Sequence, residues 1–451
     1  MTPATTGRKA KWEVGVFSFP TGQPIDPDIG AGSKMIVALT EQEWAFFPIG
    51  SIDRATGRIE ISWNQGRIDS GVIPTHLVHF PDYPEGAKQE ALCELADQAL
   101  AGDTSAVGHA IVRNDPPRFT AGHGPVDGRF VGDHQAICEW APHLDRSFVP
   151  IQGPPGTGKT FTGSHVIRSL VQAGLRVGIT AMSHHAIANL VQAVVDRYDE
   201  AGDRSLRVAC KPKGGGVAPG EEIPGVTYEA ENATCATGEY DVIAGTAWLF
   251  ASQAVRDNPV DVLVVDEAGQ LGLADTLAAS TSARNVLLLG DPQQLPQVSQ
   301  ASHPNRSGVS ALEHLLGEEH RTFSPDRGVL LDVTWRMHPD VCGFISDVMY
   351  EGKLTSEPSC SVQTTAAAGT GLRWIRADHD GCSTESAEEA KIVADLVAGL
   401  IGTDWTDQHG VTRPLTVDDV IVVTPYNDQR RRLESELGAR PSTAGVRVGT
   451  V

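Results

Sequence analysis

The eight residues from Gly153 to Thr160 have the composition and spacing of a phosphate-binding loop. They read GPPGTGKT and satisfy the pattern GxxxxGK[ST] at every fixed position. Glycines let successive backbone N–H groups turn toward phosphate oxygens, the Lys159 ammonium can reach the β- and γ-phosphates, and the Thr160 hydroxyl can ligate Mg²⁺. We therefore expect the whole loop to bind a nucleoside triphosphate through Gly153, Pro154, Pro155, Gly156, Thr157, Gly158, Lys159 and Thr160.

A pair of carboxylates follows an apolar run later in the chain. The segment VLVVDEAGQ places Asp266 and Glu267 at the end of an expected strand. Ligands of open α/β sheets bind at the carboxyl ends of the strands, so these two side chains would lie beside the phosphate loop. Asp266 is suited to hold Mg²⁺, and Glu267 to orient and deprotonate an attacking water. The pair predicts nucleotide hydrolysis.

The elements that position these residues are short apolar strands alternating with helices. Runs of this kind are typical of parallel strands covered on both faces, and they indicate an α/β domain. The loop at 153–160 lies between one such strand and an expected helix, as a phosphate loop requires. The expected strands are 148–151, 177–180, 241–246, 262–267 and 285–291.

The segments before and after this α/β domain have different patterns of apolar residues. Before the α/β domain, β-rich runs at 12–19, 34–39, 44–48 and 58–63 predict a small barrel, and a helix is expected at 88–100. A second α/β unit begins near residue 320. It is expected to contain strands 372–375, 419–424 and 446–451 and helices 385–401 and 427–437.

The composition excludes several classes of protein. The 451 residues are 40% hydrophobic and carry a formal net charge of -21, which is ordinary for a globular chain and unlike a fibrous or disordered one. No apolar run reaches the roughly 20 residues that span a bilayer, so we expect a cytoplasmic protein with no membrane partner. Seven scattered cysteines without a CxxC pair argue against a zinc or iron–sulfur site. The acidic balance argues against a nucleic-acid partner that would contact the whole surface.

Four further segments have a fixed order around the two nucleotide motifs. GDHQ places Gln135 before the phosphate loop, where its amide could bind an adenine edge. GDPQQLPQV places Gln294 after a strand, where it could sense the γ-phosphate. TWRMHP carries Trp335 and Arg336, and IVVTPYNDQ ends a strand of the second unit.

With these segments the chain resembles helicase superfamily 1, within the group that contains the nonsense-mediated-decay helicase and senataxin. The resemblance covers about residues 130–451 and implies two RecA-like P-loop domains, ATP with Mg²⁺ between them, and movement on single strands, commonly 5′→3′. By position it implies that Gln294 couples the γ-phosphate to the strand-binding surface and that Arg336 reaches the γ-phosphate. Trp335 stands where the family usually has Tyr, whose ring stacks on the adenine.

The same resemblance implies the residues that contact nucleic acid. They carry small hydroxyl or amide groups that grip a backbone without reading sequence, and they are Ser183, Asn189, Thr246, Thr424, Pro425 and Tyr426. We expect a single-stranded partner, with DNA favoured over RNA. Because such contacts use a narrow channel, the net charge decides little about them. Gln429 and the arginines after it fit either a functional surface or a solvated helix face.

The resemblance also gives domain boundaries. We expect a β-rich accessory domain at 1–86, a helical stalk at 87–121, a first RecA-like domain at 122–319 and a second at 320–451. A weaker likeness is to bacterial helicase halves fused to RecB-like nucleases, which implies a nuclease domain or subunit as a further partner. The second domain is expected to be incomplete at its C-terminal end, because the family's last motifs would follow Val451.

Two other functions fit parts of the pattern. The first is an ATP-binding, nucleic-acid-binding fragment without productive turnover, which the missing C-terminal motifs would explain. The second is a P-loop ATPase that acts on protein partners, which the WRMHP and TPYNDQ segments disfavour.

Overall fold

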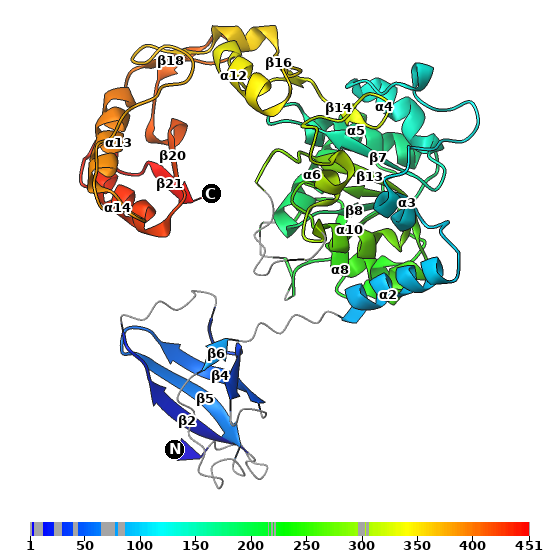
Figure 1. The fold of residues 1–451 in the computed structure, drawn as a ribbon, viewed down its shortest axis with the longest axis horizontal. Helices are drawn as coiled ribbons and strands as arrows, with labels where there is room; N and C mark the ends of the chain where they lie inside the picture. Colours follow the sequence, from blue (N-terminus) through cyan, green and yellow to red (C-terminus); the bar gives the residue numbers. More distant parts are fainter. Residues whose placement is uncertain are drawn as a thin grey trace. The chain divides into compact units, whose positions relative to one another are not determined.

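The structure of the chain is a computed structural model. It describes residues 2–3, 12–21, 29–38, 44–64, 77–79, 86–214, 216–217, 220, 222–295, 303 and 306–450. The chain divides into two compact units, Met1–Glu85 and Gly86–Val451 (Figure 1).

The N-terminal unit is an antiparallel sheet of six strands in the order β1-β2-β5-β4-β3-β6. The strands are β1 (Thr2–Pro3), β2 (Trp12–Ser18), β3 (Lys34–Ala38), β4 (Trp44–Asp53), β5 (Arg58–Asn64) and β6 (Val78–His79). Ile59 and Ile61 are buried against Phe47 and Ile49, as the alternating pattern of β5 predicts. In the described residues β1 and β6 each pair on one side only, so the sheet is open and the predicted barrel is not confirmed.

The second unit is built on a parallel sheet of eight strands in the order β10-β9-β11-β8-β12-β13-β7-β14. The strands are β7 (Phe148–Gln152), β8 (Val177–Thr180), β9 (Val208–Cys210), β10 (Val226–Tyr228), β11 (Val242–Ala244), β12 (Val260–Val265), β13 (Ala283–Gly290) and β14 (Val329–Leu330). The five strands expected from apolar runs are all present, and the structure adds β9, β10 and β14.

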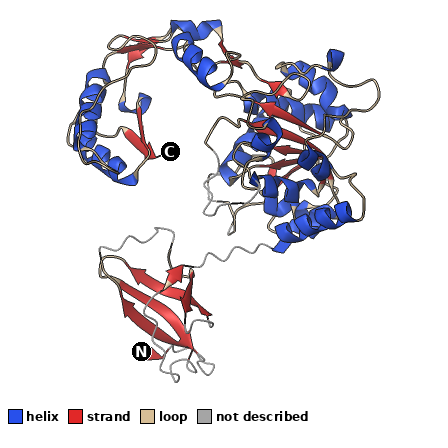
Figure 2. Ribbon diagram, viewed as in Figure 1, coloured by secondary structure: helices blue, strands red, loops and turns tan. Residues whose placement is uncertain are grey.

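Helices cover both faces of this sheet, which explains why its strands are mostly apolar (Figure 2). In β12, Val262 and Val264 belong to one hydrophobic cluster, while Leu263 and Val265 belong to the other. The first cluster includes α4 (His134–Trp140), α5 (Lys159–Gln172) and α6 (His184–Glu200). The second includes α3 (Val107–Arg113), α7 (Asn232–Cys235), α8 (Ala247–Phe250), α9 (Gln253–Arg256), α10 (Leu273–Ser280) and α11 (Ala311–Leu316).

The helix expected at 88–100 is present as α2 (Gly86–Leu100), and it packs against α8 and α10. The Lys88 ammonium forms an ion pair with Asp275 at 2.8 Å and lies 4.1 Å from the centre of the Trp248 ring. Glu94 pairs with Arg256 of α9. These contacts attach α2 to the helices that cover the large sheet.

The chain after β14 contains smaller elements. They are β15 (Val333–Thr334), α12 (Pro339–Met349), β16 (Thr355–Ser356), β17 (Thr364–Thr365), α13 (Ala387–Leu400), β18 (Asp404–Thr406), β19 (Thr412–Pro414), β20 (Ile421–Thr424), α14 (Asn427–Gly438) and β21 (Arg447–Thr450). β20 and β21 are parallel, and Val422 packs with Leu433 of α14 and Ala394 of α13. None of the described helices has the length and hydropathy needed to cross a membrane.

The strand expected at 372–375 is wrong. Residues 372–379 contain neither helix nor strand, and Trp374 is 93% exposed. The backbone carbonyl of Leu372 accepts a hydrogen bond from the Arg373 side chain. An apolar run becomes a strand only where a neighbouring strand pairs with it, and here no described strand does.

Candidate functional site

The phosphate loop connects β7 to α5, as the sequence predicts. Its first residue, Gly153, donates a backbone hydrogen bond to Gly290 at the end of β13 (2.8 Å). The Lys159 ammonium donates to the Gly153 carbonyl oxygen (2.7 Å), so this side chain lies across the loop. Thr160 is exposed in the first turn of α5, where free N–H groups and the helix dipole favour an anion.

Gly156 has room for no side chain. Its φ is +78°, and a Cβ atom there would lie 2.4 Å from Cβ of Arg336 and 2.7 Å from Oγ1 of Thr334. Trp335 donates its backbone N–H to the Gly156 carbonyl (2.8 Å), and the Thr334 hydroxyl donates to that of Pro155 (2.9 Å). The structure therefore brings the segment of Trp335 and Arg336, far along the chain, against the phosphate loop.

Asp266 and Glu267 directly follow β12. Asp266 is 5% exposed, and burial together with the neighbouring Glu267 raises its pKa to about 6. The Glu267 backbone N–H donates to Oδ1 of Asp266 (3.0 Å), and Glu267 itself has a φ of +49°. A positive φ is uncommon for a residue other than glycine.

The turn after β12 packs closely on the turn after β13. A Cβ atom at Gly269 would lie 2.3 Å from the carbonyl oxygen of Asp291, so the DEAG segment needs glycine here. Ala268 donates its N–H to Leu289 of β13 (2.8 Å). This packing places the Glu267 segment beside the turn that carries Gln294.

Gln294 is half-buried and its side chain is held by an acidic neighbour. Its Nε2 donates to Oδ2 of Asp291 at 3.3 Å. Asp291 is 1% exposed and also accepts from the Gln293 N–H (3.1 Å) and the Tyr350 hydroxyl (2.7 Å). No role is expected from the sequence for Asp291, which lies in the GDPQQLPQV segment, or for Tyr350, which directly follows α12.

Gln135 is exposed in the first turn of α4, next to the start of α5. The ring of its neighbour His134 packs edge-on against Phe161, with 5.2 Å between the ring centres. Phe161 directly follows Thr160 and is 48% exposed. Gln135 therefore lies at the same end of α5 as the phosphate loop.

The residues expected to contact nucleic acid in the first α/β domain share this edge of the sheet. Because all eight strands are parallel, the carboxyl ends of β11, β8, β12, β13 and β7 lie side by side in that order. Thr246 follows β11 and Ser183 follows β8, while the nucleotide residues follow β12, β13 and β7. Ser183 caps α6 by accepting from the Ala186 N–H (3.1 Å), and Asn189 is exposed on that helix.

The TPYNDQ segment connects β20 to α14. Thr424 is 5% exposed, whereas Pro425 and Tyr426 are exposed at the carboxyl end of β20. Gln429 is 5% exposed, and the solvated-face interpretation is wrong for it. Its Oε1 accepts from the Ser386 N–H (2.7 Å) and its Nε2 donates to the Ser386 carbonyl (3.2 Å).

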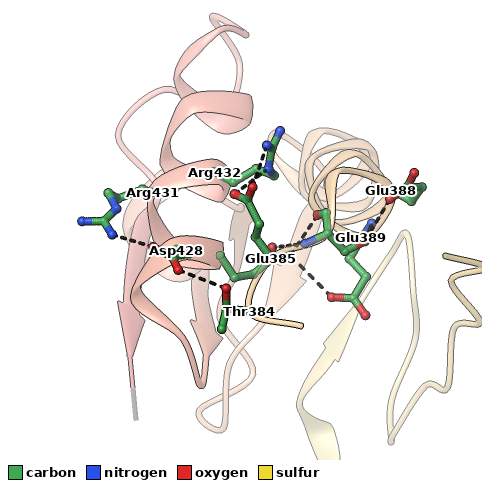
Figure 3. A network of polar contacts seen from close by, with 9 residues as sticks. Thr384, Glu385, Glu388, Glu389, Asp428, Arg431 and Arg432 are labelled. Atoms are coloured by element: carbon green, nitrogen blue, oxygen red, sulfur yellow. Dashed lines mark hydrogen bonds and ion pairs between the residues drawn. The ribbon is translucent and has the colours of Figure 1, made fainter. Parts of the chain in front are cut away.

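Polar side chains of α14 also contact the segment that precedes α13 (Figure 3). Asp428 accepts from Thr384 and Arg431, and Arg432 pairs with Glu385. The segment before α13 is thus fixed to α14 by several side chains.

The donors present suit a magnesium nucleotide more than a metal bound by protein alone. In the part of the chain that the structure describes, no group of three or more His, Cys, Asp or Glu side chains is arranged to hold a metal ion. Mg²⁺ commonly takes one or two protein oxygens and completes its shell with substrate phosphates and water. One buried carboxylate and one helix-terminal hydroxyl, beside a loop of backbone donors, fit that requirement.

Comparison with known proteins gives matches over most of the chain. Two family models, each described as an AAA domain, match residues 134–311 and 308–451. A DNA replication ATP-dependent helicase/nuclease of Arabidopsis thaliana is 23% identical over 327 residues, 66% of this chain and 23% of that protein. The mouse DNA-binding protein SMUBP-2 is 26% identical over 346 residues, 64% of this chain and 34% of that protein.

A mouse 3′-5′ exoribonuclease, HELZ2, is 29% identical over 235 residues, 47% of this chain and 7% of that protein. Among solved structures, an arterivirus helicase aligns with 97% of this chain and 76% of its own at 14% identity, with a TM-score of 0.37 that is too low to establish a shared fold. The chain spans between 7% and 34% of these three relatives. These relatives favour the helicase interpretation over the non-hydrolysing alternative. With the order of its motifs, these matches support the resemblance to helicase superfamily 1, in the group of the nonsense-mediated-decay helicase, senataxin and the DNA replication helicase/nucleases.

Proposed function

We propose that this chain is an ATP-driven motor that moves on single-stranded nucleic acid. The proposal rests on one observation: the residues expected to bind ATP and those expected to bind nucleic acid lie at the carboxyl ends of adjacent strands. Nucleotide residues follow β7, β13 and β12, and small polar residues follow the adjacent β8 and β11. ATP and a strand bound along the same edge would be coupled through neighbouring turns.

The reaction is the hydrolysis of ATP to ADP and phosphate. Glu267 accepts a proton from the attacking water as the water oxygen bonds to the γ-phosphorus, and the bond to the bridging oxygen of the β-phosphate breaks. Lys159 and the N–H groups of the phosphate loop stabilise the negative charge on the transferring group. Gln294 and Arg336 would contact the same phosphate from the turn after β13 and from the segment docked on Gly156.

Mg²⁺ would be held by the Thr160 hydroxyl and the Asp266 carboxylate, and it supplies neutralisation of phosphate charge. Asp266 must be ionised for this, and the positive charge of a cation would favour that form of a buried acid. The adenine would lie between the Trp335 ring, which is 61% exposed, and the Gln135 amide.

Nucleic acid would contact Ser183, Asn189 and Thr246 on the first RecA-like domain. On the second it would contact Thr424, Pro425 and Tyr426. We propose 122–319 and 320–451 as these domains, after an accessory region at 1–86 and a stalk at 87–121. We further propose that the strand is single-stranded DNA rather than RNA and that movement is 5′→3′. We also propose association with a nuclease domain or subunit, which the relatives named as helicase/nucleases support.

Phosphate release tests the proposal most directly. ATP turnover by the whole chain is measured alone and with oligo-dT, oligo-U or blunt duplex DNA at equal nucleotide concentration. We expect oligo-dT to stimulate turnover most and blunt duplex least. Stimulation by oligo-U alone would show an RNA motor, and ATP binding without turnover on any nucleic acid would show the non-hydrolysing alternative.

Direction is measured separately. A translocase displaces streptavidin from one end of a biotinylated strand, and 5′→3′ movement predicts faster displacement from the 3′ end. Faster displacement from the 5′ end would contradict the proposed polarity.

A further inference from the structure

Helix α12 is attached at both ends to the edge of the sheet that carries the nucleotide residues. Before the helix, Trp335 donates to the Gly156 carbonyl (2.8 Å). After the helix, the hydroxyl of Tyr350 donates to Oδ2 of Asp291 (2.7 Å). The helix therefore connects the Arg336 segment, docked on the phosphate loop, with the turn that carries Gln294.

The contact at the C-terminal end of α12 is a buried hydrogen bond to a carboxylate. Tyr350 is 2% exposed and Asp291 is 1% exposed. Burial and the nearby Asp291 raise the pKa of Tyr350, so the phenol keeps its proton and remains a donor. A hydrogen bond to a charged acceptor is stronger than one between neutral groups, and burial strengthens it further.

The same carboxylate oxygen orients Gln294. Oδ2 of Asp291 accepts from Nε2 of Gln294 (3.3 Å), while Oδ1 accepts from the Gln293 N–H (3.1 Å). Rotation of the carboxylate would therefore change the position of the Gln294 amide. The Tyr350 hydroxyl opposes that rotation because it holds Oδ2.

A second set of contacts fixes the turn after α12 independently of Tyr350. The Glu351 carboxylate accepts from the Arg321 N–H (2.8 Å) and the Thr322 hydroxyl (2.8 Å). The Arg321 carbonyl in turn accepts from Gln152 at the end of β7 (2.9 Å). Loss of the single Tyr350 hydroxyl would leave these bonds in place, so the helix would stay docked.

We propose that Tyr350 is a positioning residue that sets the orientation of Gln294 through Asp291 and ties the turn that carries Gln294 to the C-terminal end of α12. The proposal rests on the γ-phosphate role that we assign to Gln294. It predicts that the Tyr350 hydroxyl contributes to turnover only while Gln294 is present. A residue that merely stabilised α12 would act equally with and without Gln294.

A double-mutant cycle on the whole chain separates these possibilities. The variants are Tyr350→Phe, Gln294→Ala and the double variant, with kcat, KM for ATP and Kd for ATP measured with single-stranded DNA. We expect Tyr350→Phe to lower kcat about 3- to 10-fold, less than the full value of a charge-assisted hydrogen bond because the hydroxyl acts on turnover only through Gln294, with Kd for ATP within twofold. The double variant should have the same kcat as Gln294→Ala.

Ser346→Ala is the matched control. Ser346 is a buried hydroxyl of α12 that accepts from the Leu354 N–H (2.9 Å), and its removal should leave kcat within twofold. Thermal unfolding checks that each variant folds. If Tyr350→Phe does not fold, Asp291→Asn keeps the volume, weakens the charged acceptor and takes its place in the cycle.

The outcomes distinguish the inference from the proposed function. Losses that multiply in the double variant, or a Tyr350→Phe chain with unchanged kcat, would overturn the role of Tyr350 alone. An unchanged kcat for Gln294→Ala would contradict the role of Gln294 and with it this inference.

Discussion

The backbone N–H of Glu267 donates a hydrogen bond to the side-chain carboxylate of Asp266, its own neighbour in sequence. The contact occupies one oxygen of Asp266 and occurs with Glu267 in the left-handed region of backbone conformation. Consecutive residues of an extended strand point to opposite faces, so a departure from extended backbone at Glu267 is what the two proposed roles require. The proposed function assigns Asp266 to the metal and Glu267 to the water.

Replacement of Glu267 by Gln tests that assignment. Removal of a general base lowers turnover by about 10²–10⁴-fold, while the amide keeps the size of the side chain. We expect phosphate release to fall by that factor and the Kd for ATP to stay within threefold. Glu239→Gln is the control, because Glu239 is exposed just before β11, at the opposite edge of the same sheet. Retained hydrolysis would mean that another group is the base.

Replacement of Lys159 by Ala should weaken ATP binding. The ammonium that now donates to Gly153 is the only side-chain cation of the phosphate loop sequence, and a charge-assisted hydrogen bond contributes ~1.5–3 kcal/mol. We expect the Kd for ATP, measured with a fluorescent analogue, to rise about 10- to 100-fold. Lys391→Ala on the exposed face of α13 should leave it unchanged. An equal effect of both substitutions would show that ATP affinity depends on the net charge of the protein and not on a specific contact of Lys159.

We expect Trp335 to contribute to ATP binding through the stacking of its ring on the adenine, which another aromatic residue could also provide. Stacking of a base on an aromatic ring is worth ~1–3 kcal/mol, so Trp335→Ala should raise KM for ATP about 5- to 100-fold. Trp335→Tyr should restore most of the affinity. Trp374→Ala is the control, because Trp374 is 93% exposed in the segment without regular structure. A Tyr variant as weak as the Ala variant would argue against stacking.

Thr246 allows a test of strand binding that does not disturb the fold. It begins α8 without a side-chain capping bond, whereas Ser183 caps α6 through its hydroxyl. Thr246→Val should therefore weaken binding of oligo-dT about 3- to 10-fold with an unchanged melting temperature. Ser183→Ala should weaken binding and also lower stability by ~1 kcal/mol because it loses a cap. Unchanged oligo-dT affinity in both variants would exclude these residues from the contact.

Glu351 predicts a dependence of stability on pH. The Lys353 ammonium, the Arg321 N–H and the Thr322 hydroxyl lower its pKa from 4.5 to about 2. An acid whose pKa is lowered by folding contributes stability above its unfolded pKa and loses it as pH falls through the folded value. At pH 7 Glu351→Gln should cost about 1–2 kcal/mol, and the difference from the parent chain should shrink between pH 4.5 and 2.

Chemical denaturation at several pH values measures this difference. Glu319→Gln, at an exposed position, is the control and should match the parent chain throughout. A Glu351→Gln difference that stays constant with pH would show that the carboxylate's charge does not contribute.

The features that could be predicted from the sequence are those whose signals are local. Each of these signals lies within one short stretch of sequence: the phosphate loop, the DE pair and the apolar runs of β7, β8, β11, β12 and β13. Each of these strands is buried on both faces, so its apolar composition indicates its position in the sheet. The helices α2, α13 and α14 follow from short-range periodicity in the same way.

The contacts between distant segments could not be predicted from the sequence and are seen only in the folded chain. The fold placed Arg336 against Gly156, gave the Asp291 carboxylate to Tyr350, buried Gln429 and left 372–375 without a partner strand. Each of these outcomes depends on a contact between residues far apart in the chain. A single sequence carries no periodic signal for such contacts, because the partner of a hydroxyl, an amide or a strand edge is chosen by packing rather than by its own neighbours.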